Sequence, residues 1–591
     1  MNFLQIYTRL CRYAGRSEKI RGIQSPSEKL EENLEFLNLE VEGKDVISLT
    51  TLGGILGSGV VFIVMLLTWK FNLTIFLPVS SMPLPVLIYL SIGKYPEWKA
   101  NNKRTKLLGG APLLISYIAI ALKINSNLER SVKFSAEHVN NPLGKDLRDE
   151  LWKGLIRANR EVKEVLSEFG KKWKNQGKEL KQSIDLIKSS ISEKNEDNRK
   201  EILDQALETS FLGITSRMES FAASLQLPTV VIYGIGVLLP LVLLAVLPVL
   251  SSTGINVTGT ELFLVYCFFL PLIVYLTQKQ TLAKRPAAFP APDIPSEDNR
   301  GKAISISIIV AIVPLIFTAF FKIPNQIVVL IFLWSLSSGI AIFCYLSSAK
   351  TYRIREMNRS LEGEFCDSLT QLGNQLKSNI PAEKAFRRTA KTTKWSEISK
   401  ILEKTSANIE IGGMNVQTAL FDPKVGSLKD VHSPPIRNTF RMLKDLLNQS
   451  THAAGEAITY SASHLKRLKK LETRIRRNLN EIVSSMKSVA VFFAPLITSV
   501  TIQLQQMLSR KTSGMPLFGS GVQISPSIFL GTLGFYVIIL TMLLSSYAVE
   551  IEWGKDRLIK RMSIARALPT AMIVFTLGLF LGNQMLKFLV G

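Results

Sequence analysis

The chain has 591 residues and a formal net charge of +24, and it combines 47% hydrophobic with 20% charged residues. A soluble globular protein rarely shows both features, whereas a membrane protein does because apolar spans and charged loops are averaged together. The four cysteines are far apart and form no C-x-x-C pair, so neither a disulfide framework nor a zinc site is indicated.

The chain begins with a basic segment, residues 1–45, that contains no long apolar run. A signal peptide needs such a run directly after its basic residues. We therefore expect this segment to be cytosolic and partly helical, and the first true span to direct membrane insertion.

Nine apolar runs follow along the chain. A helix needs roughly 20 apolar residues to cross a hydrocarbon core about 30 Å thick. The sequence therefore predicts an all-α, polytopic membrane protein with about nine transmembrane helices. The runs are 46–69, 73–93, 229–250, 261–277, 303–321, 326–348, 489–508, 526–549 and 568–589.

The positions of lysine and arginine predict the orientation of these spans. If the N-terminus is inside, the outer segments contain only Lys70, Lys322, Arg510 and Lys511, and nearly all other basic residues are inside. Such an excess marks the cytoplasmic side. We expect a multi-pass cell-membrane protein with its N-terminus in the cytosol and its C-terminus outside.

The middle of each span lacks Asp, Glu, Lys and Arg. Ion-coupled carriers usually keep ionisable groups there, since a buried charge is costly and is retained for a purpose. This absence argues against transport. Prolines inside the spans, which are common in membrane helices, are interpreted as helix kinks. They are Pro240, Pro248, Pro271, Pro314 and Pro495.

Two long segments, 94–228 and 349–488, separate the spans and are expected in the cytosol. The first has 24 basic and 18 acidic residues, a net charge of +6, and the second has 25 and 14, a net charge of +11. Apolar residues recur at helical spacing in both. The charged stretch 171–198 is interpreted as a solvated helical arm or a mobile insert. The predicted organisation is 1–45 cytosolic, 46–93 spans 1–2, 94–228 first helical domain, 229–277 spans 3–4, 278–302 cytosolic linker, 303–348 spans 5–6, 349–488 second helical domain and 489–591 spans 7–9.

The two cytosolic segments share one pattern. An offset of 254 residues aligns 122–132 with 376–386, pairing Asn125 with Asn379 and Glu129 with Glu383. In each copy a polar turn ends one helix, and the next helix carries an acidic residue in its first turn, where it suits the positive helix end. The chain therefore looks internally duplicated.

These residues resemble the type II secretion system F domain, a helical bundle of inner-membrane platform proteins. The resemblance rests on the polar turns at 122–126 and 376–380, the helices that follow, and the segment from Gly413 to Leu420. In the first copy the last segment, 159–166, has no glycine. The nine-span layout looks like the archaeal versions that serve type IV pili and archaella. The resemblance implies a platform under a growing filament that binds pilin-like subunits and couples to a cytosolic hexameric ATPase.

The sequence contains no signature of an enzyme. It has no phosphate-binding loop, no G-x-S-x-G elbow and no H-E-x-x-H motif. We therefore expect no catalytic activity, no cofactor and no metal. The alternative function is a transporter or channel with regulatory cytosolic domains. Nonspecific attraction to anionic lipid explains the net charge as well as nucleic-acid binding does, so no nucleic-acid partner is expected.

Two basic clusters are candidate binding surfaces. The first follows the family helix of the second copy, and we interpret it either as the ATPase contact or as a plain solvated face. The second precedes the seventh span, and we interpret it either as a basic stripe that contacts lipid headgroups beside the membrane or as a contact with a partner protein. The expected partners are the ATPase, pilin-like subunits, membrane lipids and a second copy of the chain. The clusters are Arg387, Arg388, Lys391 and Lys394, and Lys466, Arg467, Lys469, Lys470, Arg474, Arg476 and Arg477.

Overall fold

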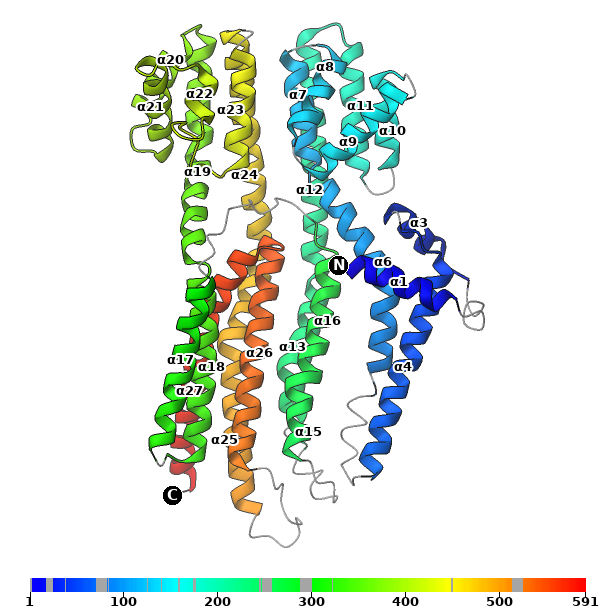
Figure 1. The fold of residues 1–591 in the computed structure, drawn as a ribbon, viewed down its shortest axis with the longest axis vertical. Helices are drawn as coiled ribbons and strands as arrows, with labels where there is room; N and C mark the ends of the chain where they lie inside the picture. Colours follow the sequence, from blue (N-terminus) through cyan, green and yellow to red (C-terminus); the bar gives the residue numbers. More distant parts are fainter. Residues whose placement is uncertain are drawn as a thin grey trace.

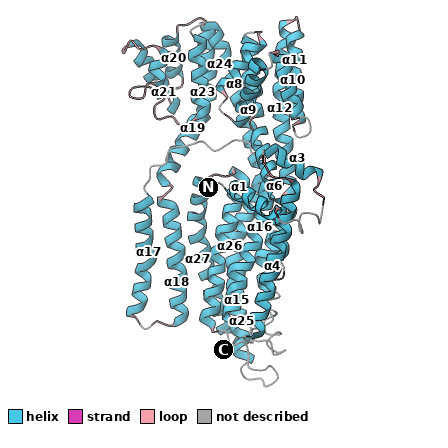
Figure 2. Cartoon of the chain, turned by 45° about the vertical axis from the view of Figure 1, so that its right-hand side comes forward, coloured by secondary structure: helices cyan, strands magenta, loops and turns pink. Residues whose placement is uncertain are grey.

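The computed structural model of the chain consists of helices joined by turns and loops, and no strand occurs in the described residues (Figure 2). The expected all-α class is therefore confirmed. The described residues are 3–16, 25–37, 39–70, 82, 84–124, 126–139, 141–157, 160–173, 177–243, 246, 258–286, 300–321, 323–447, 450–512 and 525–590.

The molecule is elongated, with a bundle of long apolar helices at one end and two smaller groups of helices at the other (Figure 1). The N-terminus lies where the bundle meets the two groups, and the C-terminus lies at the far end of the bundle (Figure 1). We call 111–224 the first helical unit and 349–488 the second helical unit.

Eight helices within the described residues are long and apolar enough to cross a membrane. They overlap eight of the nine predicted runs. The remaining run, 73–93, falls partly outside the described residues, so its span stays a prediction. The eight are Gly43–Leu66, Glu196–Leu243, Gly259–Ala283, Gly301–Thr318, Asn325–Leu346, Thr451–Met507, Pro526–Trp553 and Arg557–Gln584.

The first helical unit has its own hydrophobic core, in which Leu114, Phe169 and Trp173 are at most 2% exposed. Asparagine caps start several of its helices: the Asn127 side chain accepts a hydrogen bond from the Arg130 N–H at 3.0 Å. Such caps satisfy donors that a helix start leaves free. The helices are α7 (Ala111–Ile124), α8 (Leu128–His138), α9 (Pro142–Trp152), η1 (Lys153–Arg157), α10 (Val162–Lys172), α11 (Lys178–Ser192) and α12 (Glu196–Ser224).

The interpretation of 171–198 as a solvated arm or mobile insert is wrong. Leu180, Ile184 and Ile187 project from α11 into the core of the first unit and are 1–2% exposed. The charges of this stretch occupy the other face of the helix. One narrow apolar face is enough to hold a helix against a core, even in a highly charged segment.

The second helical unit surrounds a core of its own that contains Phe365, Phe386 and Phe440, and Ile120 of α7 in the first unit packs into this core. Two long helices, α19 and α24, run from this core toward the bundle (Figure 1). The helices are α19 (Ala349–Lys377), α20 (Ala382–Thr392), α21 (Glu397–Glu410), α22 (Val416–Phe421), α23 (Pro434–Leu447) and α24 (Thr451–Ser488).

The two units meet through α24. The Ser116 Oγ and His464 Nδ1 atoms are 3.0 Å apart, and the buried His464 ring stacks on Phe211 with centroids 5.4 Å apart. The buried Lys123 pairs with Asp204 at 2.7 Å, and its Nζ lies 4.5 Å from the centre of the Tyr460 ring. The units therefore share a specific polar junction in addition to their separate cores.

The N-terminal helices α1 (Phe3–Gly15) and α3 (Glu28–Leu37) lie beside α4 (Gly43–Lys70) and α6 (Leu84–Leu108). Tyr7, Cys11, Leu34 and Val46 form a small core there. The hydroxyl of Tyr7 donates to the carbonyl of Ile92 at 3.1 Å. The expectation of a partly helical N-terminal segment is confirmed for these residues.

Helix α26 is the centre of the bundle, with sixteen buried residues. The remaining elements of the bundle lie around it and come before or after it in the sequence. Apart from α26 itself (Pro526–Trp553), these are α13 (Gln226–Tyr233), η2 (Gly234–Leu238), α15 (Gly259–Leu264), η3 (Val265–Phe269), α16 (Leu270–Ala283), α17 (Arg300–Phe320), α18 (Asn325–Leu346), η4 (Val489–Phe493), α25 (Ala494–Thr512) and α27 (Arg557–Val590).

Three membrane helices contain a π-helical turn, and each turn is followed two residues later by a proline: Pro240, Pro271 or Pro495. Proline lacks the N–H that would complete the helical ladder. Neighbouring hydroxyls supply bonds at these turns, since Tyr536 donates to the carbonyl of Gly236 and Thr541 donates to that of Ala490. Three of the five predicted kink prolines therefore follow π-helical turns, whereas Pro314 lies inside α17 without one and Pro248 lies outside the described residues.

Candidate interaction surfaces

Helix α20 exposes the first predicted basic cluster. Phe386 and Ala390 point into the core, while Arg387, Arg388 and Lys391 lie on the opposite, exposed face. Lys394 is exposed in the turn that follows. The helix is strongly amphipathic, which explains this separation.

The four basic side chains differ in their partners. Arg387 pairs with Glu410 of α21 at 2.7 Å. Within the described residues, Arg388, Lys391 and Lys394 have no carboxylate partner. We call these three side chains the α20 patch, because their charge is available to a partner and that of Arg387 is largely neutralised.

An exposed tryptophan adjoins the α20 patch, and the sequence reasoning missed it. Trp395 lies between α20 and α21 with a relative exposure of 102%, the highest of any large apolar side chain described. Tryptophan and arginine are enriched among the residues that dominate binding energy at interfaces. The signal in the sequence was a single aromatic residue inside the polar stretch 391–397.

The second basic cluster lies along α24. Three of its members reach carboxylates: Lys466 pairs with Asp367 at 3.0 Å, Arg474 with Glu219 at 3.4 Å, and Arg476 with Glu472. Arg467, Lys469, Lys470 and Arg477 are exposed. The pairing of Arg474 reaches the first helical unit, so part of this cluster joins the units.

The family-motif residues occupy turns and helix starts. Asn379 has a φ of 55°, and Gly413 has a φ of 61°, a backbone region that most side chains avoid. Glu129 and Glu383 lie in the first turns of α8 and α20, as expected from their favourable interaction with a helix N-terminus. Asn125 lies outside the described residues.

A third cluster surrounds Trp553 at the end of α26, and of its arginines Arg476 belongs to a basic cluster predicted from the sequence, whereas Arg355 and Arg359 do not. Arg355 and Arg359 come from α19, and Arg476 comes from α24. Arg355 also pairs with the buried Asp556. These contacts join residues up to about 200 positions apart in the chain, a distance that local sequence patterns do not register.

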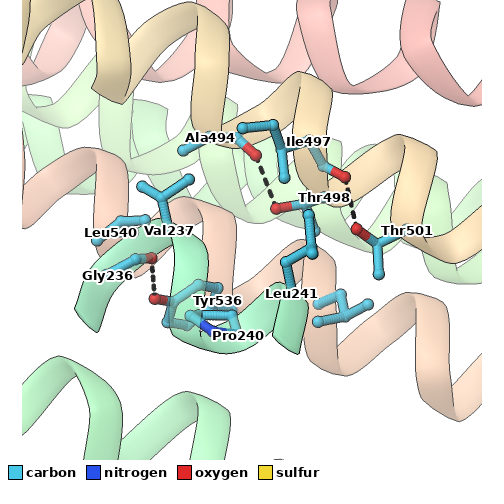
Figure 3. Close-up of a pocket in the computed structure, with 11 residues that line it drawn as sticks. Gly236, Val237, Pro240, Leu241, Ala494, Ile497, Thr498, Thr501, Tyr536 and Leu540 are labelled. Atoms are coloured by element: carbon cyan, nitrogen blue, oxygen red, sulfur yellow. Dashed lines mark hydrogen bonds between the residues drawn. The ribbon is translucent and has the colours of Figure 1, made fainter. Parts of the chain in front are cut away.

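Figure 3 shows a small crevice in the bundle, between the third, seventh and eighth predicted spans. Pro240, Leu241 and Thr498 line it, and the Tyr536 hydroxyl spans it to Gly236. Its cavity volume is about 10 Å³, close to the least that one water molecule needs. This crevice is too small to hold a solute.

The described residues contain no group of three or more His, Cys, Asp or Glu side chains that could hold a metal ion. The four cysteines are free thiols, and Cys11, Cys344 and Cys366 are buried. The buried His464 packs between helices, against Ser116 and Phe211.

Comparisons of the chain with protein-family models, with curated proteins and with solved structures give no match. The functional argument therefore depends on the helical architecture, the exposed charge and the resemblance at the repeated motif.

Proposed function

We propose that the chain is a membrane platform for assembly of a type IV pilus-like filament, an archaeal pilus or archaellum. In this role the bundle holds pilin-like subunits, and the helical units receive work from a cytosolic hexameric ATPase. The chain acts as a scaffold without chemistry of its own. Its N-terminus and both helical units face the cytosol, its C-terminus faces outward, and it works as a dimer.

The correspondence between the two helical units supports this proposal. Helix α8 covers Leu128–His138 and α20 covers Ala382–Thr392, so both ends are 254 residues apart. The starts of α12 and α24, Glu196 and Thr451, are 255 residues apart. The π-helical turns η2 and η4 are also 255 residues apart. A duplicated helical domain that closes into a span is the layout implied by the resemblance to the F domain.

The proposed ATPase contact is based on the α20 patch and the exposed Trp395 beside it. An exposed aromatic side chain next to unpaired cations offers both an anchor and a charge pattern to an acidic partner. The second unit also has the larger positive excess, and it contains the Gly413 segment of the family pattern.

The test is charge reversal of the α20 patch with Arg388→Glu, Lys391→Glu and Lys394→Glu. We expect this variant to lose binding to the hexameric ATPase and to form no filaments, because complementary charge sets recognition and encounter rate. Folding should persist, since exposed changes usually cost less than about 0.5 kcal/mol each. ATPase pull-down and filament counts are measured together.

A matched control reverses three other exposed lysines of the same unit, Lys404, Lys424 and Lys429, with membrane abundance measured for both variants. Normal filaments on the patch variant would remove this surface from the mechanism. A deletion strain that keeps every surface filament but stops uptake of a solute would favour the transporter instead.

A further inference from the structure

The cluster around Trp553 lies at the end of the bundle that faces the two helical units (Figure 1). Helix α26 has 28 residues from Pro526 to Trp553. At 1.5 Å per residue it is about 42 Å long, which matches a bilayer including both headgroup layers. Trp553 therefore lies at headgroup level, where tryptophan is enriched in membrane proteins.

Three guanidinium groups gather on this indole ring. Arg476 lies 3.3 Å from the ring centre, Arg359 lies 5.1 Å from it, and Arg355 lies 5.6 Å from it. Cation–π attraction allows the like charges to gather there. The ring thus holds three cations at one level of the membrane.

Their charges are only partly balanced. Asp556, whose side chain is 3% exposed, neutralises Arg355, and Glu472 neutralises Arg476. Arg359 is exposed and has no carboxylate partner within the described residues. The Nη1 atom of Arg476 is also buried without a hydrogen-bond partner. The cluster therefore keeps a free positive charge and a free donor.

A fourth arginine reinforces the positive field. Arg285 donates to the carbonyls of Ile551 at 2.8 Å and Glu552 at 3.2 Å, and so it caps the end of α26. Burial, together with the charge of Arg476, lowers the pKa of Arg285 to about 10. Two cations that disfavour each other in a partly buried place gain from an added anion.

We propose that Arg359 and Arg476 bind the phosphate of an anionic membrane lipid beside Trp553. Guanidinium groups recognise phosphate through paired hydrogen bonds, which a lysine cannot reproduce. The membrane is the expected source because the indole lies at headgroup level. The opposite side of α19 also exposes Ile354 and Met357 at this height, as a helix in contact with a lipid surface does. This site does not depend on the proposed platform function.

The experiment compares the purified full-length chain with Arg359→Gln. Short-chain phosphatidylglycerol is titrated against phosphatidylcholine and against inorganic phosphate, and thermal stability and lipids retained in native mass spectrometry are measured. We expect stabilisation by phosphatidylglycerol alone. Arg359→Gln should need roughly tenfold more of it, a change of about 1.4 kcal/mol.

Arg353→Gln is the matched control, since Arg353 is exposed on the same helix and contacts neither Trp553 nor a carboxylate in the described structure. It should behave like the unchanged chain. Equal binding of phosphatidylglycerol by Arg359→Gln would overturn the site. Equal stabilisation by inorganic phosphate would replace the lipid with a free anion and overturn the proposal as stated.

Discussion

The two helical units have separate cores but are attached to the bundle differently. The second unit continues into the bundle through α24 and is tied to the α26–α27 turn by Arg355 on α19 and Arg476 on α24. The first unit continues through α12, and in both units the other connection breaks, at Gly109 and Gly110 between α6 and α7 and at Ser347 and Ser348 between α18 and α19. The second unit is therefore held to the α26–α27 turn by side-chain contacts from two of its helices, in addition to its one continuous helix.

The largest expected effect tests whether the cores are independent. Phe440 is fully buried in the second unit, and Phe440→Ala should cost about 3–5 kcal/mol because it leaves a cavity. We expect hydrogen exchange to rise throughout the second unit while the core around Phe169 stays protected. The lipid-facing Phe492→Ala serves as the control. Equal loss of protection in both units would mean that they unfold as one body.

The next effect concerns the buried ion pair of the first unit, between Lys123 of α7 and Asp204 of α12, which lies beside the contact of Lys123 with Tyr460 of the second unit. Asp204→Asn removes the carboxylate partner of Lys123, whose side chain is 3% exposed, and should cost about 1.5–3 kcal/mol. Thermal unfolding of the purified protein measures the loss. Asp185→Asn breaks the more exposed pair with Lys188 and should cost less than about 1 kcal/mol. A similar cost for the two variants would show that the burial of Lys123 does not strengthen its ion pair.

The smallest expected effect is a difference in pH response. Burial raises the pKa of Glu362 in the second unit, so its folded form prefers the proton and this unit gains stability as pH falls toward the unfolded value near 4.5. In the first unit burial opposes ionisation of Glu179, but the hydrogen bond from Arg217, a backbone hydrogen bond and the charges of Arg217 and Lys178 together outweigh it and lower the pKa. Stability from Glu179 is therefore lost as pH falls through 4.5 and below.

Hydrogen exchange of each unit between pH 7 and pH 4 measures this difference, at about 1.4 kcal/mol for each unit of pKa change. Glu362→Gln should flatten the response of the second unit and leave that of the first unchanged. If both units respond alike with Glu362 present, the burial of this carboxyl has no energetic consequence.

Local chemistry explains which features the sequence could predict. Span positions followed from apolar length, and the polar turn before Glu383 followed from residue type, because both are properties of neighbouring residues. The packing of 171–198 on the core of the first unit was not predicted, because the apolar face of α11 is narrow and is flanked by many charged residues. The contacts of His464 with Ser116 and of Trp553 with Arg359 join distant parts of the chain, and no local pattern encodes them. The platform role and the orientation of the termini stay proposals.

The π-helical turns have a mechanical consequence. At Pro240 and Pro495 a backbone hydrogen bond is replaced by a hydrogen bond from a hydroxyl on α26. A hydroxyl can rotate to another acceptor, whereas the hydrogen bonds of a regular helix form and break cooperatively. Helices bend at such interruptions in preference to other places. The helices that continue from α12 and α24 into the bundle thus each contain one interruption at which bending is favoured, and both interruptions are hydrogen-bonded to α26.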